Sequence, residues 1–279
     1  MDFKQSRGGF EETPLRAIVV EVSCTARDLW IKGHHEANGG NISIRLSPEE
    51  VTGLAAAESA SEWIPLAGSP LPGLAGSYFL ATSAGSCFRT LRRRPEETLG
   101  VIEFDESGQR YRVIWGFEGG NRPTSELPVH VQVHAMRREK TGVVIHSHPT
   151  HLVALSCLME PDSIALTRLL WQMHGECVAF FPRGIEFLPF RMSGSDEAGR
   201  VAAQALEKRS MLLWEFHGTF TAGPSLDAVA GLIETADKAA EIYLKVAAAG
   251  GPKRRLSLEH VKAIAKAVGV EPDPEILGG

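Results

Sequence analysis

The chain has 279 residues, of which 43% are hydrophobic and 23% are charged, and its formal net charge is -5. This composition is that of an ordinary folded protein with a substantial core, and the negative balance argues against wholesale binding to nucleic acid. No apolar stretch is long enough to span a bilayer, and the polar residues 1–12 fit no secretory signal. The absence of a CxxC pair indicates reduced thiols in a cytoplasmic protein, with cysteines at Cys24, Cys87, Cys157 and Cys177.

The N-terminal part predicts a helix, a turn and a strand. Thr13 and Pro14 have the form of an N-cap and a first-turn proline, and apolar residues then recur at helical spacing as far as Gly33. The turn Asn38-Gly39-Gly40-Asn41 follows, and residues 42–46 alternate in the manner of a half-buried strand. Residues 47–76, rich in Pro, Gly, Ala and Ser, predict a long connection with one short strand candidate at 63–66.

The rest of the chain alternates strands and helices. Strands are expected at 78–82, 99–104, 111–115, 143–148 and 211–214, and the second and third of these form a hairpin. Helices are expected from Ser125 to Ala135 and over 150–158, 195–208, 225–249 and 257–268. Because no composition break, repeat or low-complexity tract interrupts this order, we expect residues 1–279 to form one α/β domain with a mixed sheet covered by helices.

The most informative motif is His146-Ser147-His148, at the end of the apolar run that begins at Val143. A strand has a side-chain period of two, so both imidazoles leave the same face of the sheet. A third imidazole, His217, follows another apolar run, and three nitrogen ligands with an open fourth position are typical of catalytic zinc. Satisfied histidines at a strand end are the alternative, which the matching context of His217 weakens.

His130 and His134 offer a competing metal site. They lie four residues apart on a predicted helix, so both could bind a metal from one helix face. The segment lacks the base of an HExxH motif, and His134 has apolar neighbours at core spacing, so the pair is the weaker hypothesis.

Two carboxylates are candidates for proton transfer. Glu126 lies at a predicted helix start, where the helix dipole alone favours a carboxylate, but the neighbouring histidine strand places it near the predicted metal. Glu176 is the second candidate, and an exposed position on a surface strand is an equally good explanation for it.

Short polar motifs predict an anion site. The turn from Asn38 to Asn41 is a flexible turn by default, and its functional interpretation is a loop whose backbone N–H groups and amides hold a phosphate. Residues 82–85 and 124–125 supply further donors. A solvated face or a subunit contact is the favoured role for the basic run of Arg89, Arg92, Arg93 and Arg94.

The ordered set of motifs resembles the zinc-dependent class II aldolase/adducin family, and within it the bacterial enzymes that act on L-rhamnulose 1-phosphate. The resemblance extends over nearly the whole chain and rests on Asn38-Gly39-Gly40-Asn41, Pro123-Thr124-Ser125-Glu126-Leu127-Pro128, His146-Ser147-His148, Gly175-Glu176-Cys177 and Trp214-Glu215-Phe216-His217-Gly218. It implies an α/β/α layered fold around a mixed, mostly antiparallel sheet, and a homotetramer with active sites between neighbouring subunits.

The resemblance also implies roles for individual residues. His146, His148 and His217 would hold Zn²⁺, with Glu126 as a ligand of the substrate-free metal and as the base once substrate displaces it, and Glu176 would reach the site of an adjoining subunit. The phosphate would lie among donors from Asn38, Gly40, Asn41, Gly85, Thr124 and Ser125. The expected reaction is retro-aldol cleavage of a ketose 1-phosphate to dihydroxyacetone phosphate and L-lactaldehyde.

One position departs from the family pattern. The segment Thr82-Ser83-Ala84-Gly85 has Ala84 where a hydroxyl is expected, and either Ser83 or Ser86 could compensate. One neutral hydrogen bond contributes about 0.5 to 1.5 kcal/mol net, so the loss would weaken phosphate binding without abolishing it.

Two alternative functions remain open from sequence. The same fold and metal could serve another sugar-phosphate aldolase, an epimerase or a dehydratase, and product analysis separates these. An adducin-like interaction module without chemistry is the second, and it has no need of three metal-binding histidines.

Overall fold

One nine-stranded sheet organises the part of the chain that this computed structural model describes, residues 14–54, 61–66, 68, 70–192 and 194–278. The strand order is β2-β5-β4-β3-β1-β6-β9-β8-β7, and all paired strands are antiparallel except β7 and β8. In chain order the strands are β1 (Asn41–Leu46), β2 (Ile64–Pro65), β3 (Tyr78–Thr82), β4 (Leu99–Phe104), β5 (Arg110–Gly116), β6 (Val143–Ser147), β7 (Glu186–Leu188), β8 (Met211–Trp214) and β9 (Gly218–Gly223). The predicted mixed, mostly antiparallel sheet is therefore confirmed.

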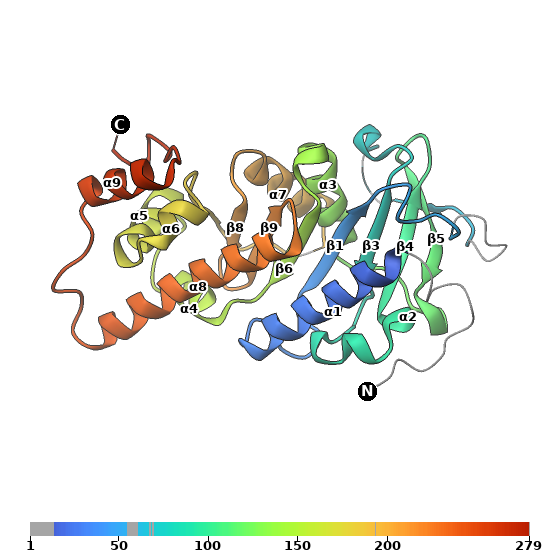
Figure 1. Ribbon diagram of the computed structural model, residues 1–279, viewed down its shortest axis with the longest axis horizontal. Helices are drawn as coiled ribbons and strands as arrows, with labels where there is room; N and C mark the ends of the chain where they lie inside the picture. The colour runs from blue at the N-terminus through green and yellow to red at the C-terminus, as the bar shows by residue number, and fades with distance from the viewer. Residues whose placement is uncertain (1–13, 55–60, 67, 69, 193, 279) are drawn as a thin grey trace.

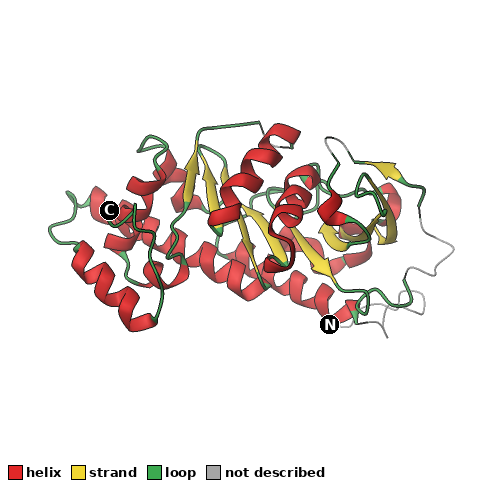
Figure 2. Ribbon diagram, turned by 90° about the horizontal axis from the view of Figure 1, so that it is seen from above, coloured by secondary structure: helices red, strands yellow, loops and turns green. Residues whose placement is uncertain are grey.

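Helices cover both faces of this sheet (Figures 1 and 2). They are α1 (Leu15–Ile31), α2 (Pro95–Thr98), α3 (Leu127–Arg137), α4 (Thr150–Ser156), α5 (Ser163–Met173), α6 (Glu176–Phe180), α7 (Asp196–Lys208), α8 (Leu226–Ala248) and α9 (Leu258–Val268). Helices α1 and α8 share one hydrophobic cluster, whereas α3 and α7 build another on the opposite face. This is the α/β/α arrangement that the sequence predicted. None of the described helices is both long and apolar enough to cross a membrane.

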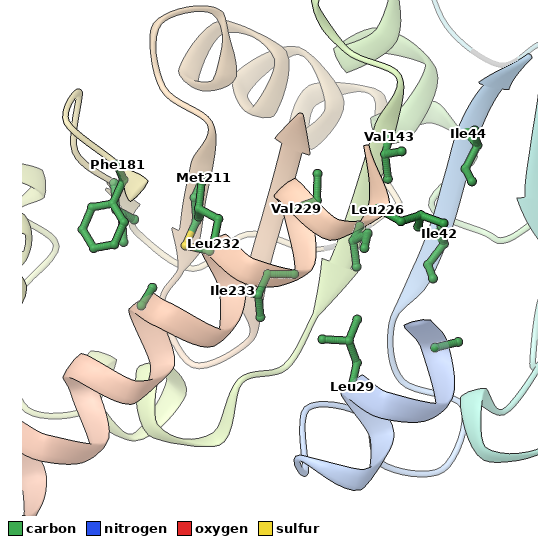
Figure 3. Packing of buried hydrophobic residues seen from close by; sticks show 14 of the residues in the cluster. Leu29, Ile42, Ile44, Val143, Phe181, Met211, Leu226, Val229, Leu232 and Ile233 are labelled. Atoms are coloured by element: carbon green, nitrogen blue, oxygen red, sulfur yellow. The ribbon is translucent and has the colours of Figure 1, made fainter. Parts of the chain in front are cut away.

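The alternation of side chains along β6 explains the two clusters. Val143 and Ile145 belong to the cluster with α1 and α8, whereas Val144 belongs to the cluster with α3 and α7. Figure 3 shows part of the first cluster, in which Leu226 of α8 lies between Val143 of β6 and Leu29 of α1. Side chains alternate along a strand with a period of two. His146, two residues after Val144, therefore lies on the same face of β6 and points toward α3.

Most predicted helices and strands are present. Some of them begin or end at other residues than predicted, and some elements of the structure were not predicted. The candidate cap Thr13 lies outside the described residues, and α3 begins at Leu127, two positions after the predicted start. Helices α2, α5 and α6 and strands β7 and β9 were not predicted. Glu176 opens α6, so the alternative interpretation of it as a residue of a surface strand was wrong. Helix α6 has five residues, too few for a helical periodicity to emerge from the sequence.

Leu213 of β8 provides a test of this packing. Its side chain is 0% exposed, whereas that of Leu158 is 64% exposed. We expect Leu213→Ala to lower the free energy of unfolding by about 2 to 5 kcal/mol because it leaves a cavity, and Leu158→Ala to change it by less than about 0.5 kcal/mol. Urea denaturation of both variants measures this difference, and equal losses would contradict the assigned core.

Candidate metal centre

Three histidine side chains converge at the end of β6. The ring centroids of His146 and His148 lie 4.8 Å apart. The ring centroid of His217 lies 4.8 Å from that of His146 and 5.2 Å from that of His148. Among the described residues these three form the one group of potential metal ligands, with ligand atoms all within 4.8 Å of one another. The prediction that His146 and His148 leave the same face as neighbours of His217 is confirmed.

Local backbone geometry delivers His217 to this group. Strands β8 and β9 pair antiparallel up to Trp214 and Gly218, and the short loop between them carries His217. Phe216 has a left-handed φ of 57°, which turns the chain back toward β6. A Cβ atom on Gly218 would lie 2.4 Å from the backbone oxygen of Ser147, so only glycine permits this close approach.

The contacts of the Nδ1 atoms of His146 and His148 assign a proton to each. His146 Nδ1 lies 2.9 Å from the backbone oxygen of Thr219, and His148 Nδ1 lies 2.8 Å from Glu36 Oε1. A carbonyl and a carboxylate only accept hydrogen bonds, so each Nδ1 carries a proton, and in its neutral, metal-binding form each ring presents a lone pair at Nε2. These two Nε2 atoms face each other at 3.0 Å.

Glu126 adds a further acceptor to the same place. Its Oε2 lies 3.3 Å from His146 Nε2, and its side chain is 8% exposed. In the neutral form of the rings, these lone pairs and the carboxylate repel one another unless a cation lies among them. Zinc binds imidazole nitrogen at about 2.0–2.1 Å, which puts tetrahedral ligand atoms about 3.3 Å apart, so the donor set fits a divalent metal of this kind.

The protonation of the histidines also suits metal binding. Burial, followed by the neighbouring His148 and His217, lowers the pKa of His146 well below its ordinary value. Burial and His148 lower the pKa of His217, against an opposing effect of Glu36. Neutral imidazoles are the form that binds metal, so these two ligands need no deprotonation near neutral pH.

Hydrogen bonds from its backbone and its side chain fix the position of Glu126. Its backbone N–H donates to Thr124 Oγ1 at 3.3 Å, and its Oε2 accepts a hydrogen bond of 2.7 Å from Asn41 Nδ2. Asn41 lies directly opposite His146 in the register of β1 and β6, so the amide and the imidazole share a sheet face. The buried carboxylate thus has a defined orientation beside the candidate metal.

The predicted phosphate loops come together around Glu126. The backbone N–H of Thr124 donates to the oxygen of Thr82, which joins the loops at 82–86 and 122–125. Gly40 and Gly85 have φ angles of +78° and +76°, a conformation that favours glycine and that occurs in anion-binding loops. Asn38, Gly85 and Ser125 are exposed. Their role as phosphate ligands, together with Gly40, Asn41 and Thr124, remains a prediction.

Neither serine near Ala84 offers an exposed hydroxyl. Ser83 is 5% exposed and Ser86 is 8% exposed. The Ser86 hydroxyl donates to the backbone oxygen of Ser83 at 2.8 Å. The hydroxyl that the family pattern places at residue 84 therefore has no evident replacement from these two side chains.

His130 and His134 do not form a second metal site. Ser43 Oγ lies between them, 2.7 Å from His130 Nδ1 and 2.9 Å from His134 Nε2. Both histidines are fully buried against β1. The preference for the β6 group over this helical pair is supported by the structure.

Two further acidic residues, Glu176 and Glu36, differ in their relation to the site. Glu176 is exposed at the start of α6, which packs against α8 and α9, so its proposed role at an adjoining subunit stays a prediction. Glu36, which orients His148, was missed by the sequence analysis. Glu36 lies in the loop after α1, far from β6 in sequence. The one sequence signal that could have linked it to the site is its position just before the turn that begins at Asn38.

A metal-content measurement tests the ligand assignment. We expect the purified protein to bind about one zinc ion per chain and His148→Ala to lose most of it, because catalytic zinc needs three protein ligands. His260→Ala, which changes an exposed histidine of α9, should retain the wild-type content. Inductively coupled plasma mass spectrometry gives both values, and full metal retention in His148→Ala would exclude His148 as a ligand.

Buried neutral histidines predict a pH dependence of stability. Burial lowers the pKa of His35 and His130 to about 3, and it lowers the pKa of His134 and His146 well below the ordinary value. Below about pH 6.5 the unfolded chain binds protons that these folded-state rings do not, so stability falls as the pH falls.

Each such histidine should cost about 1.4 kcal/mol per pH unit between pH 6.5 and its folded-state pKa. Denaturation of the chelator-treated protein at pH 7.5 and at pH 5.5 measures the loss. Equal stability at the two pH values would show that these rings are not buried in the neutral form.

Comparisons with known proteins agree with this geometry. A family model described as Class II Aldolase and Adducin N-terminal domain matches residues 20–244. A rhamnulose-1-phosphate aldolase of Pectobacterium atrosepticum is 39% identical over 249 residues, covering 88% of this chain and 91% of the relative. The enzyme of that name from Escherichia coli O127:H6 is 40% identical over 250 residues, with 88% and 91% covered.

A solved structure with a similar fold supports the same assignment. The crystal structure of a sugar-phosphate aldolase from Thermotoga maritima has a TM-score of 0.73 at 30% identity, and the match covers 85% of this chain and 98% of that chain. Because the family match spans most of the chain and curated relatives share more than a third of its residues, the chain belongs to the class II aldolase and adducin family.

Proposed function

We propose that this chain is a zinc-dependent lyase that reversibly cleaves L-rhamnulose 1-phosphate to dihydroxyacetone phosphate and L-lactaldehyde. The observation that carries the proposal is the convergence of three imidazole nitrogens, with Glu126 Oε2 3.3 Å from His146 Nε2, in a chain 39% identical to a rhamnulose-1-phosphate aldolase over 88% of its length. An interaction module without chemistry has no use for such a group of potential metal ligands.

His146, His148 and His217 would hold the metal through nitrogen atoms that the fold already directs at one another. When bound, zinc supplies Lewis-acid polarisation of the substrate's carbonyl group, which stabilises the negative charge that develops on C–C cleavage. Thr219 and Glu36 keep the rings of His146 and His148 in the tautomer that binds metal.

Glu126 is the proposed group for proton transfer at carbon. Cleavage breaks the C3–C4 bond, its electron pair stays with C3, and a proton added to C3 completes dihydroxyacetone phosphate. The carboxyl group of Glu126 is buried, oriented by Asn41 and adjacent to the metal group, which suits delivery of that proton and its removal in the reverse direction. Glu176 of an adjoining subunit is the proposed acceptor of the C4 hydroxyl proton.

The substrate phosphate is proposed to bind at the joined loops. Backbone N–H groups at Gly40 and Gly85 and the exposed side chains of Asn38 and Ser125 offer donors there, with Asn41 and Thr124 beside them. We further propose a homotetramer with active sites between subunits and a cytoplasmic location. The described cysteine thiols are free, which supports a reducing compartment.

Glu126→Gln tests the proton-transfer role. The amide keeps the size of the side chain and cannot carry the proton, so we expect kcat to fall at least about 100-fold, the range typical of general acid–base catalysis. Thermal stability and zinc content should change little. A coupled assay for dihydroxyacetone phosphate gives the rate, and wild-type turnover in this variant would remove Glu126 from the mechanism.

A substrate panel tests the reaction itself. We expect dihydroxyacetone phosphate to be released faster from L-rhamnulose 1-phosphate than from other ketose 1-phosphates, and the activity to disappear with chelator and return with zinc. An epimerised or dehydrated product from the same substrate, with no dihydroxyacetone phosphate, would replace the aldolase assignment by one of the alternative reactions of this fold.

A further inference from the structure

A continuous series of buried side chains lies behind Glu126. Asn41 Nδ2 contacts Glu126 Oε2 at 2.7 Å, and Asn41 Oδ1 makes a short contact with His130 Nε2. His130 Nδ1 in turn lies 2.7 Å from Ser43 Oγ. Asn41 and Ser43 are two residues apart on β1 and share one face, and His130 reaches that face from α3. Neither the metal ligands nor the phosphate loops account for His130.

The carboxylate at the end of this series fixes the direction of every hydrogen bond in it. An ionised Glu126 only accepts, so Asn41 turns its Nδ2 toward Glu126 and its Oδ1 toward His130. Asn41 Oδ1 only accepts, so His130 Nε2 must carry the proton of the neutral ring. His130 Nδ1 is then the acceptor, and the Ser43 hydroxyl donates to it.

Each donor therefore points toward Glu126. Chains of hydrogen bonds with one direction polarise each other, and they are stronger where water is excluded. Asn41 is 6% exposed and His130 is 0% exposed. Burial also keeps His130 neutral, because it lowers the pKa of the ring to about 3.

The orientation of the Asn41 amide depends on the donor from His130. An amide has two orientations of similar shape, and the wrong one would present Oδ1 to the Glu126 carboxylate, oxygen against oxygen. His130 Nε2–H favours the correct orientation because it donates to Oδ1 and cannot accept from Nδ2. The fold supplies this donor from α3, the helix that Glu126 precedes.

We propose that His130 is a positioning residue: through Asn41 it holds the Glu126 carboxylate in the orientation needed for proton transfer at the substrate carbon. This inference rests on the proposed function of Glu126. The ring nitrogens of His130 contact Ser43 and Asn41, so His130 would act through Asn41 and not on the substrate itself. Its loss should therefore affect the proton-transfer step more than substrate binding.

Two substitutions separate the roles of the ring nitrogens. The amide nitrogen of Gln lies close to the position of histidine Nε2, whereas that of Asn lies close to Nδ1. His130→Gln can therefore still donate to Asn41, and His130→Asn cannot. Val133→Ala is the matched control, because Val133 is fully buried on the same helix, in the cluster with α7.

The principal experiment is exchange of the dihydroxyacetone phosphate C3 proton in D₂O, followed by NMR, on zinc-loaded enzymes of verified metal content. We expect His130→Asn to slow exchange and kcat at least about tenfold with KM changed less than threefold. His130→Gln should recover most of the rate, and Val133→Ala should lose thermal stability without losing rate. Wild-type exchange in His130→Asn, or no recovery in His130→Gln, would overturn the proposal.

Neutron diffraction of the wild-type protein provides a test that needs no activity. We expect deuterium on His130 Nε2 and on the Asn41 nitrogen that faces Glu126. Deuterium on Nδ1 in place of Nε2 would refute the positioning role even in an active enzyme. If instead the wild-type protein cleaves no ketose 1-phosphate, the proposed function fails, and the proton positions still decide whether His130 orients Asn41 and Glu126.

Discussion

The candidate metal centre depends on hydrogen-bond acceptors that the fold holds close together. The Nδ1 atoms of His146 and His148 contact a carbonyl and a carboxylate, and their Nε2 atoms lie 3.0 Å apart, with Glu126 Oε2 3.3 Å from that of His146. In the neutral form of the rings, the lone pairs on these Nε2 atoms repel each other and the carboxylate, and the surrounding backbone keeps the groups from separating. A divalent cation would convert this repulsion into coordination, so metal binding and the local fold would stabilise each other.

The sheet holds these hydrogen-bond acceptors close to one another. Strand β6 lies between β1 and β9, and the register puts Asn41 and Phe220 on either side of His146. The Phe220 ring stacks on His146 at 4.4 Å, and the amide of Asn41 holds Glu126. Adjacent strands thus limit the motion of the ligands, while the loops at their ends stay exposed to a substrate. Strong electrostatic effects in catalysis need such preorganised groups.

The candidate metal ligands could be identified from sequence because a simple periodicity places two of them together. His146 and His148 follow an apolar run, and the period of two in a strand places both rings on one face whatever the rest of the fold. His217 depended on a similarity of context, and its approach to β6 uses a left-handed Phe216 and the close packing of Gly218, neither of which has a periodic signal. The resemblance to a family supplied the link between these distant segments.

Other features depend on tertiary contacts that no local pattern specifies. Glu36 reaches His148 across 112 positions of sequence, and the partnership of Asn41 with His130 spans 89. The sequence assigned Asn41 to phosphate, whereas the structure shows that its amide also touches Glu126. Helix α6 was missed because one short turn resembles a strand in both length and composition. Contacts between segments far apart in sequence determine which polar residues become neighbours.

Zinc binding by the three histidines can be tested with an anomalous difference map collected at the zinc absorption edge from crystals of the protein. We expect one strong peak for each chain, about 2.0–2.1 Å from the Nε2 atoms of His146 and His148 and from a ring nitrogen of His217. A zinc-supplied crystal with no peak among these rings, or with its only peak at another group, would contradict it.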